Sequence, residues 1–113
     1  MTRQALHSTA RLAIAAVIAL YLAGAPAYAD GTEVTIDNFT FTPPVLTVAR
    51  GTRVTWTNHD DIPHTVTSSQ DPGKMHSPVL DTDEMYILTF DTPGTYGFFC
   101  SLHPHMQSQV VVR

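Results

Sequence analysis

The 113-residue sequence contains a single cysteine, so the chain cannot form an internal disulfide. Lysine and arginine together number only six, against ten acidic residues. So few basic residues cannot build the positive surface that binds phosphate backbones, which argues against a nucleic acid as partner. After residue 29 there is no apolar run long enough to cross a bilayer, which takes about 20 residues. These absences leave a small acidic protein without disulfides or a later membrane span.

Residues 1–29 have the features of a secretory signal peptide. Two arginines precede an almost continuous apolar run over 12–22, and an Ala-Tyr-Ala cleavage signal ends at Ala29. We therefore predict cleavage after Ala29 and export to the periplasm, with an uncleaved membrane anchor as the alternative. Two of the six basic residues lie in the leader, so residues 30–113 keep four and carry a formal net charge of 4 − 10 = −6. This remainder is expected to be one monomeric domain, released from the membrane.

Residues 30–113 alternate polar and apolar side chains in short runs, as β-strands with one buried face do. Turn signals such as Pro72-Gly73 and Pro93-Gly94 separate these runs. Several short strands at this spacing predict an all-β, Greek-key β-sandwich, and no helical pattern of useful length is present. The predicted strands are 33–37, 45–49, 52–57, 64–68, 86–90, 95–99 and 109–112. The predicted core aromatics are Phe39, Phe41, Trp56, Phe90 and Phe98.

Four side chains that bind metals occur in two segments that are distant in the sequence. Cys100, His103 and Met106 are three residues apart in one loop, and His64 follows a proline upstream. Thiolate sulfur suits Cu(I), imidazole nitrogen suits Cu(II), and a cysteine, two histidines and a weak axial methionine are the ligands of a blue-copper electron-transfer site. The predicted ligands of one copper ion that alternates between Cu(I) and Cu(II) are His64, Cys100, His103 and Met106.

Other interpretations of this ligand set stay open at the level of sequence. A copper carrier or chaperone would bind Cu(I), although such sites often use several methionines and residues 30–113 contain only three. An enzyme with Cys100 as nucleophile would leave Met106 without a role. Structural zinc would use thiolate and imidazole, but a thioether is a poor zinc ligand. The remaining histidines after the leader are expected to face solvent: His59, His76 and His105.

These residues resemble the cupredoxin family of small blue-copper proteins, and within it the amicyanins more than plastocyanin or pseudoazurin. The resemblance covers nearly all of residues 30–113, including the stretches 39–43, 51–58 and 61–64, and the spacing of two residues on each side of His103 is the amicyanin-like detail. It implies a non-enzymatic protein that shuttles single electrons between exported redox partners, such as a dehydrogenase or a c-type cytochrome. It also implies that His103 lies near the surface in an apolar patch that includes Leu102.

The chain departs from the cupredoxin pattern at three positions. Thr65 stands directly after the first histidine ligand, where most relatives have an asparagine that braces the cysteine loop. We expect the Thr65 hydroxyl to make a similar hydrogen bond, because contacts outside the ligand set tune metal sites. Within the loop, Leu102 and His105 replace the proline and phenylalanine that are common in amicyanin-like relatives. Leu102 restores a backbone N–H donor, and His105 adds a titratable group near the expected docking face.

Overall fold

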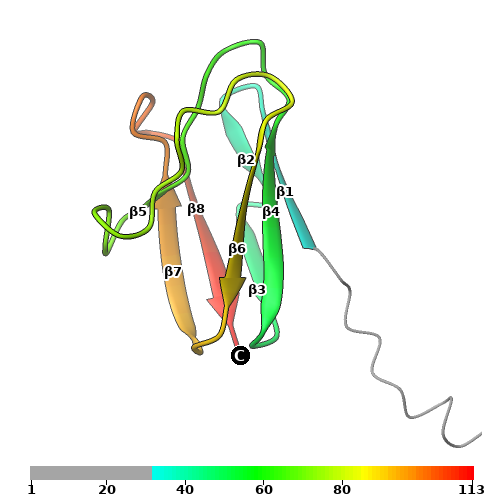
Figure 1. Cartoon of the computed structure of the whole chain (residues 1–113), viewed down its shortest axis with the longest axis vertical. Helices are drawn as coiled ribbons and strands as arrows, with labels where there is room; N and C mark the ends of the chain where they lie inside the picture. The colour runs from blue at the N-terminus through cyan, green and yellow to red at the C-terminus, as the bar shows by residue number, and fades with distance from the viewer. Residues whose placement is uncertain (1–31) are drawn as a thin grey trace, which may run out of the picture.

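The computed structural model describes residues 32–113, which form eight β-strands and no helix (Figure 1). The predicted signal peptide over 1–29 lies outside the described residues. Within the described part, the structure contains no helix of the length and apolarity needed to span a membrane. The strands are β1 (Thr32–Asp37), β2 (Thr40–Thr42), β3 (Val45–Val48), β4 (Thr52–Asn58), β5 (Thr67–Ser68), β6 (Met85–Phe90), β7 (Gly94–Phe99) and β8 (Gln107–Val112).

The strands form two four-stranded sheets, with the orders β2-β1-β4-β6 and β3-β8-β7-β5. Two pairs are parallel, β1 with β4 and β3 with β8, and the other pairs are antiparallel. Only β1–β2 and β7–β8 are consecutive neighbours, because the chain crosses between the sheets at each connection from β2 to β7. The predicted all-β architecture with two sheets is confirmed, whereas the parallel pairs were not anticipated.

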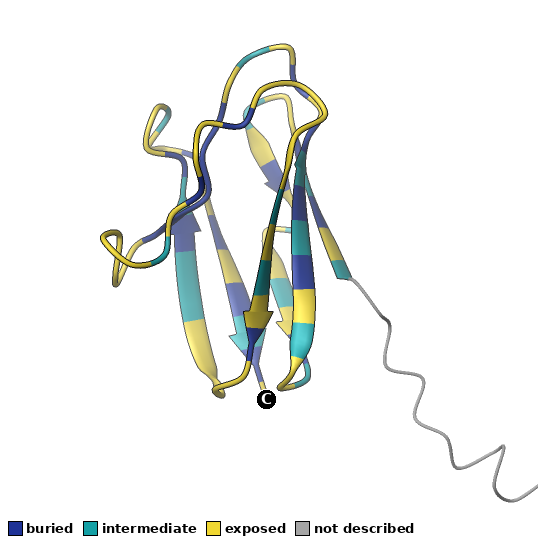
Figure 2. Ribbon diagram, in the orientation of Figure 1, coloured by how far each residue is buried: buried dark blue, intermediate teal, exposed yellow. Residues whose placement is uncertain are grey.

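The core lies between the two sheets and is built from alternate residues of the strands. Figure 2 shows buried and exposed positions succeeding one another along the strands. Trp56 on β4 is fully buried, and its ring lies 5.1 Å from that of Phe98 on the opposite sheet. Such interdigitation across the interior is what a sandwich with polar outer faces requires. Four of the five predicted core aromatics are buried, namely Phe41, Trp56, Phe90 and Phe98, whereas Phe39 is only partly buried.

One predicted strand is shorter than expected and one strand was missed. The run 64–68 contributes only Thr67 and Ser68 to β5, while His64 forms an isolated bridge with Leu80. The backbone N–H groups of Thr65 and Val66, just before β5, donate to side chains and not to a neighbouring strand. The Val66 N–H, for example, donates to the Ser77 hydroxyl at 2.8 Å. Strand β2 was missed because three residues are too short for an alternation pattern to be recognised.

Several connections gather at the end of the sandwich opposite the C-terminus (Figure 1). They are the β1–β2 turn, the segment after β4, the segment before β6 and the loop between β7 and β8. Backbone hydrogen bonds join them in pairs, as between Asn58 N–H and the Glu84 carbonyl oxygen at 3.0 Å. A rigid sandwich with linked loops at one end can hold side chains from distant parts of the sequence in fixed positions.

Candidate metal centre

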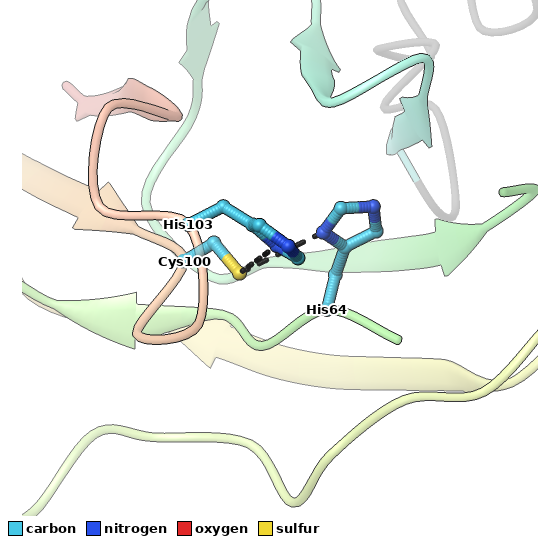
Figure 3. Close-up of side chains that lie close together, drawn as sticks. All are labelled: His64, Cys100 and His103. Carbon is cyan, nitrogen blue, oxygen red and sulfur yellow. Dashed lines mark hydrogen bonds between the residues drawn. The ribbon is translucent and has the colours of Figure 1, made fainter. Parts of the chain in front are cut away.

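Three of the four predicted ligands converge at this end of the sandwich. His64, Cys100 and His103 each offer a ligand atom, and these atoms lie within 4.8 Å of one another. The Cys100 sulfur is 3.7 Å from Nδ1 of His64 and 3.7 Å from Nδ1 of His103. Figure 3 shows His64 approaching from one segment and the other two side chains from the β7–β8 loop, all directed at a common point.

His64 is held by the segment that follows β4. Asn58, the last residue of β4, is fully buried, and its side-chain amide donates to the carbonyl oxygens of Ile62 and Leu80 at 3.0 and 2.9 Å. Its own side-chain oxygen accepts the backbone N–H of Asp60. The backbone of His64 exchanges two hydrogen bonds with Leu80, at 3.1 and 2.8 Å. With its side chain fully buried, His64 is therefore fixed by the fold itself.

Cys100, His103 and Met106 belong to the short loop between β7 and β8. The Cys100 N–H donates to the Met106 carbonyl oxygen, and the Met106 N–H donates to that of His103, so the loop closes on itself. The Cys100 side chain is fully buried, Met106 is 3% exposed, and His103 is part-buried. A compact loop of this kind places the sulfur beneath the surface and one imidazole at the surface. The role of Met106 as a fourth ligand stays a prediction.

Thr65 connects the two ligand-bearing segments. Its backbone N–H donates to the Cys100 sulfur at 3.3 Å, a contact that stabilises a thiolate. Its hydroxyl oxygen accepts the Ser101 N–H at 2.8 Å and lies 2.9 and 3.0 Å from the hydroxyls of Ser101 and Thr67. The expectation that Thr65 braces the cysteine loop is confirmed.

Asp60 is a site residue that the sequence analysis missed. Its carboxylate lies 2.7 Å from Nε2 of His64 and also accepts the backbone N–H groups of Asn38 and Phe39. Burial by itself would raise the pKa of Asp60, but these hydrogen bonds outweigh it and lower the pKa from 3.8 to about 2. The carboxylate is therefore ionised at neutral pH and can only accept, so Nε2 of His64 carries the hydrogen and Nδ1 presents its lone pair towards Cys100.

Phe39 also takes part in the site, although the sequence analysis assigned it to the core. Its ring packs edge-on against His64, with centroids 5.5 Å apart, and against His103 at 4.9 Å. The two imidazoles are themselves 5.0 Å apart. One aromatic side chain from the β1–β2 turn thus contacts both histidines and restricts the room in which their rings can turn.

The other three histidines lie apart from this group, as predicted. His59, His76 and His105 are exposed. His59 is 3.7 Å from the Asp83 carboxylate, and Nδ1 of His76 is 2.9 Å from the Pro72 carbonyl oxygen. His105 is among these exposed residues although it lies in the same loop as His103.

The donor set fits one metal ion. Bonds from zinc, a comparable ion, to histidine nitrogen and cysteine sulfur are about 2.1 and 2.3 Å, so an ion can reach both atoms of a pair 3.7 Å apart. The thiol has no disulfide partner, is buried, and has Thr65 N–H and two imidazole nitrogens around its sulfur. Soft sulfur with two imidazoles is a donor set that suits copper.

Comparisons with known proteins point to the same type of site. The family profile described as a cupredoxin-like domain matches residues 10–112. Amicyanin-alpha of Methylorubrum extorquens is 37% identical over 112 residues, which cover 96% of this chain and 91% of that protein. The chloroplastic plastocyanin of Tetradesmus obliquus is 34% identical over 84 residues, or 65% of this chain and 58% of that protein. A solved amicyanin variant with Cu(I) superposes with a TM-score of 0.69 at 32% identity, covering 74% of this chain and 82% of the other.

Proposed function

Because this chain belongs to the cupredoxin-like family, we propose that it is a type 1 (blue) copper protein that carries single electrons between exported redox proteins. The observation that carries the proposal is the buried convergence of the Cys100 sulfur with two imidazole nitrogens, each 3.7 Å away. When bound, copper supplies a one-electron couple between Cu(I) and Cu(II). The proposed ligands are His64, Cys100, His103 and Met106.

The residues around the site favour rapid electron transfer by limiting movement. Thr65 ties the cysteine loop to the His64 segment, and Phe39 packs on both imidazoles. Since each ligand is held by contacts that do not involve a metal, little rearrangement is needed when an electron arrives or leaves. A site that reorganises little at the moment of reaction has a low barrier, as in other preorganised centres.

We assign the exit of the electron to His103, which is the ligand nearest to solvent. Its ring is part-buried, whereas His64 is fully buried. Leu102 beside it is 48% exposed, and Pro104 and Pro63 are exposed as well. An apolar surface with few charges at its centre suits transient docking of a redox partner. The donor and acceptor are proposed to be a dehydrogenase or a c-type cytochrome, by analogy with the cupredoxins.

The proposed setting is the periplasm. Residues 1–29 would act as a cleaved signal peptide, and 30–113 as a monomeric copper-binding domain without catalytic residues. A net charge of −6 on that domain favours a soluble exported protein.

The test is the colour of the purified protein after loading with Cu(II). We expect intense blue absorption from thiolate-to-copper charge transfer, which ascorbate bleaches. Cys100→Ser should abolish it, whereas His105→Ala, a matched change at an exposed histidine of the same loop, should leave it intact. A colourless protein that binds only Cu(I) would show a copper carrier instead, and colour retained in Cys100→Ser would overturn the ligand assignment.

A further inference from the structure

Asp60 lies at the point where the His64 segment meets the β1–β2 turn. The residue is 8% exposed, and each carboxylate oxygen is used: Oδ1 accepts Asn38 N–H at 2.6 Å, and Oδ2 accepts Phe39 N–H at 3.0 Å and His64 Nε2–H at 2.7 Å. Its backbone is also held, because the Thr82 hydroxyl donates to the Asp60 carbonyl oxygen at 2.6 Å. A buried carboxylate with three N–H donors has little freedom to move.

The first consequence of the Asp60 hydrogen bonds concerns the orientation of the His64 ring. A neutral imidazole has one N–H and one lone pair, and the partner of one nitrogen decides which nitrogen is free to bind a metal. Since Asp60 binds Nε2–H, the lone pair of Nδ1 faces the Cys100 sulfur 3.7 Å away. The carboxylate therefore selects the ligating nitrogen before any ion arrives.

The second consequence of the Asp60 hydrogen bonds concerns the backbone of the β1–β2 turn. Asn38 and Phe39 have φ angles of 51° and 56°, in the left-handed region that is unfavourable for a bulky residue such as Phe39. The two N–H groups of this turn are those that Asp60 accepts. The carboxylate thus stabilises a turn whose left-handed backbone is unfavourable at Phe39, and that turn places the Phe39 ring on both imidazoles.

We propose that Asp60 is the positioning residue of the metal centre. One carboxylate sets the tautomer and orientation of His64 and, through the strained turn, the position of the Phe39 ring that restrains His103. Asp60 touches no reacting atom, and its effect passes through His64 and Phe39. The proposal deepens the copper function above and rests on it.

The negative charge of Asp60 adds an electronic effect to the geometric one. A carboxylate bonded to the far nitrogen of a ligating histidine makes the near nitrogen a stronger donor. A stronger donor and a nearby negative charge favour the more highly charged ion, so Cu(II) gains more than Cu(I). Removing the charge should therefore weaken Cu(II) binding more than Cu(I) binding and raise the reduction potential.

The first experiment uses the metal-free, unmodified protein and needs no variant. Long-range ¹⁵N–¹H correlation spectra at pH 8 report which nitrogen of each histidine carries the hydrogen. We expect His64 to be entirely the Nε2–H form and the exposed His105 to show a mixture of both tautomers. A mixture at His64 as well would overturn the proposal, because the carboxylate would then not control the ring.

The second experiment compares Asp60→Asn with Asp61→Asn, which removes the same charge from an exposed neighbouring residue. For Asp60→Asn we expect Cu(II) affinity to fall about 10-fold relative to Cu(I), equivalent to a potential about 59 mV higher for a one-electron couple. The metal-free variant should also lose the single tautomer and show shifted Phe39 ring resonances. Asp61→Asn should match the unmodified protein, and equal shifts in both variants would reduce the effect to net charge and overturn the proposal.

Asp60→Glu keeps the experiment decisive if Asp60→Asn does not fold. This variant retains the carboxylate, so we expect the Nε2–H tautomer to persist, with a potential closer to that of the unmodified protein than to that of Asp60→Asn. A mixed tautomer in a folded Asp60→Glu protein counts against positioning by the carboxylate. The copper function fails separately, if the unmodified protein is not blue, whereas a blue protein whose tautomer and potential ignore residue 60 refutes only the role of Asp60.

Discussion

The two imidazoles of the site are held in different ways. His64 is fully buried, both of its ring nitrogens have polar neighbours, and its backbone is paired with Leu80. His103 is part-buried, and within residues 32–113 its ring has the Cys100 sulfur as its polar neighbour and the Phe39 and His64 rings as aromatic contacts. The interior of the fold holds His64 and Asp60, which form the buried half of the site. The short surface loop from Cys100 to Met106 presents His103 and forms the exposed half.

For the proposed electron-transfer function, this division reconciles two requirements that conflict. A metal site must be rigid to change charge with little rearrangement, yet one ligand must approach the surface for a partner to come close. Burying His64 among hydrogen-bonded loops provides the rigidity, and the seven-residue loop from Cys100 to Met106 provides the approach. Thr65 and Phe39 join the halves, and Asp60 holds the turn that carries Phe39, so the exposed half is steadied by the buried one.

Removing each imidazole in turn should give the largest difference between the halves. We expect His64→Gly and His103→Gly both to lose the blue absorption of the copper-loaded protein. Added free imidazole should restore most of it in His103→Gly, where the gap opens towards solvent, and almost none in His64→Gly, where the gap is buried against Asp60. Titration with imidazole, followed by visible absorption, makes the comparison. Equal rescue of both variants would show that burial does not distinguish them.

Phe39 contacts both histidines, so replacing it should weaken both halves together. Phe39→Ala removes a partly buried ring and should lower the free energy of unfolding of the metal-free protein by about 2–3 kcal/mol, below the range for a fully buried phenylalanine. Phe39→Gly also loses the ring but relieves the strain at φ 56°, so it should be more stable than Phe39→Ala by about 1 kcal/mol. Urea denaturation measures both. The usual order, with alanine more stable than glycine, would contradict the account of this turn.

The site residues that were predicted and those that were missed differ in what identifies them. Cys100 and His103 were predicted because metal-ligand residue types at short spacing carry chemical meaning without a structure, and His64 because it is a histidine after a proline in a stretch that resembles the cupredoxins. Asp60 and Phe39 carry no such pattern, since an aspartate in an acidic loop and an aromatic beside a strand are ordinary. Their role arises only when β1 pairs in parallel with β4, which brings the β1–β2 turn beside the segment after Asn58. Of the two, Asp60 had a weak signal, because it stands four residues before a predicted ligand.

The fold shows the same limit. Alternation over 52–57 was sufficient to predict β4, whose burial follows the pattern residue by residue. The same pattern over 64–68 overestimated β5, because alternation does not reveal that backbone groups near His64 and Thr65 bind side chains of the site. Strand neighbours such as β3 with β8 are separated by most of the chain, and local patterns carry no information on such pairs.

Acid should weaken the buried half selectively, because Asp60 belongs to it and the Cys100–Met106 loop contains no carboxylate. The pKa of Asp60 is lowered from 3.8 to about 2, so its ionised form stabilises the fold above pH 3.8 and this contribution is lost as the pH falls through 2. The difference corresponds to about 2 kcal/mol. Urea unfolding of the metal-free protein between pH 5 and pH 2 should show this loss of stability. Asp61→Asn should lose the same amount, whereas Asp60→Asn should not show the loss. Parallel curves for all three proteins would contradict it.

The smallest expected effect lies at the link between the halves. Thr65→Val keeps the shape of the side chain but removes the oxygen that accepts the Ser101 N–H at 2.8 Å, leaving that donor without this partner. A part-buried N–H that loses its acceptor costs about 1 kcal/mol in the free energy of unfolding, and Thr65→Ser, which keeps the oxygen, should lose much less. Because the bond steadies the loop and not the His64 segment, amide hydrogen exchange should quicken at Ser101 and stay unchanged at His64. Faster exchange at His64 by a similar factor would mean that the two halves open as one unit, and the comparison drawn between them would not hold.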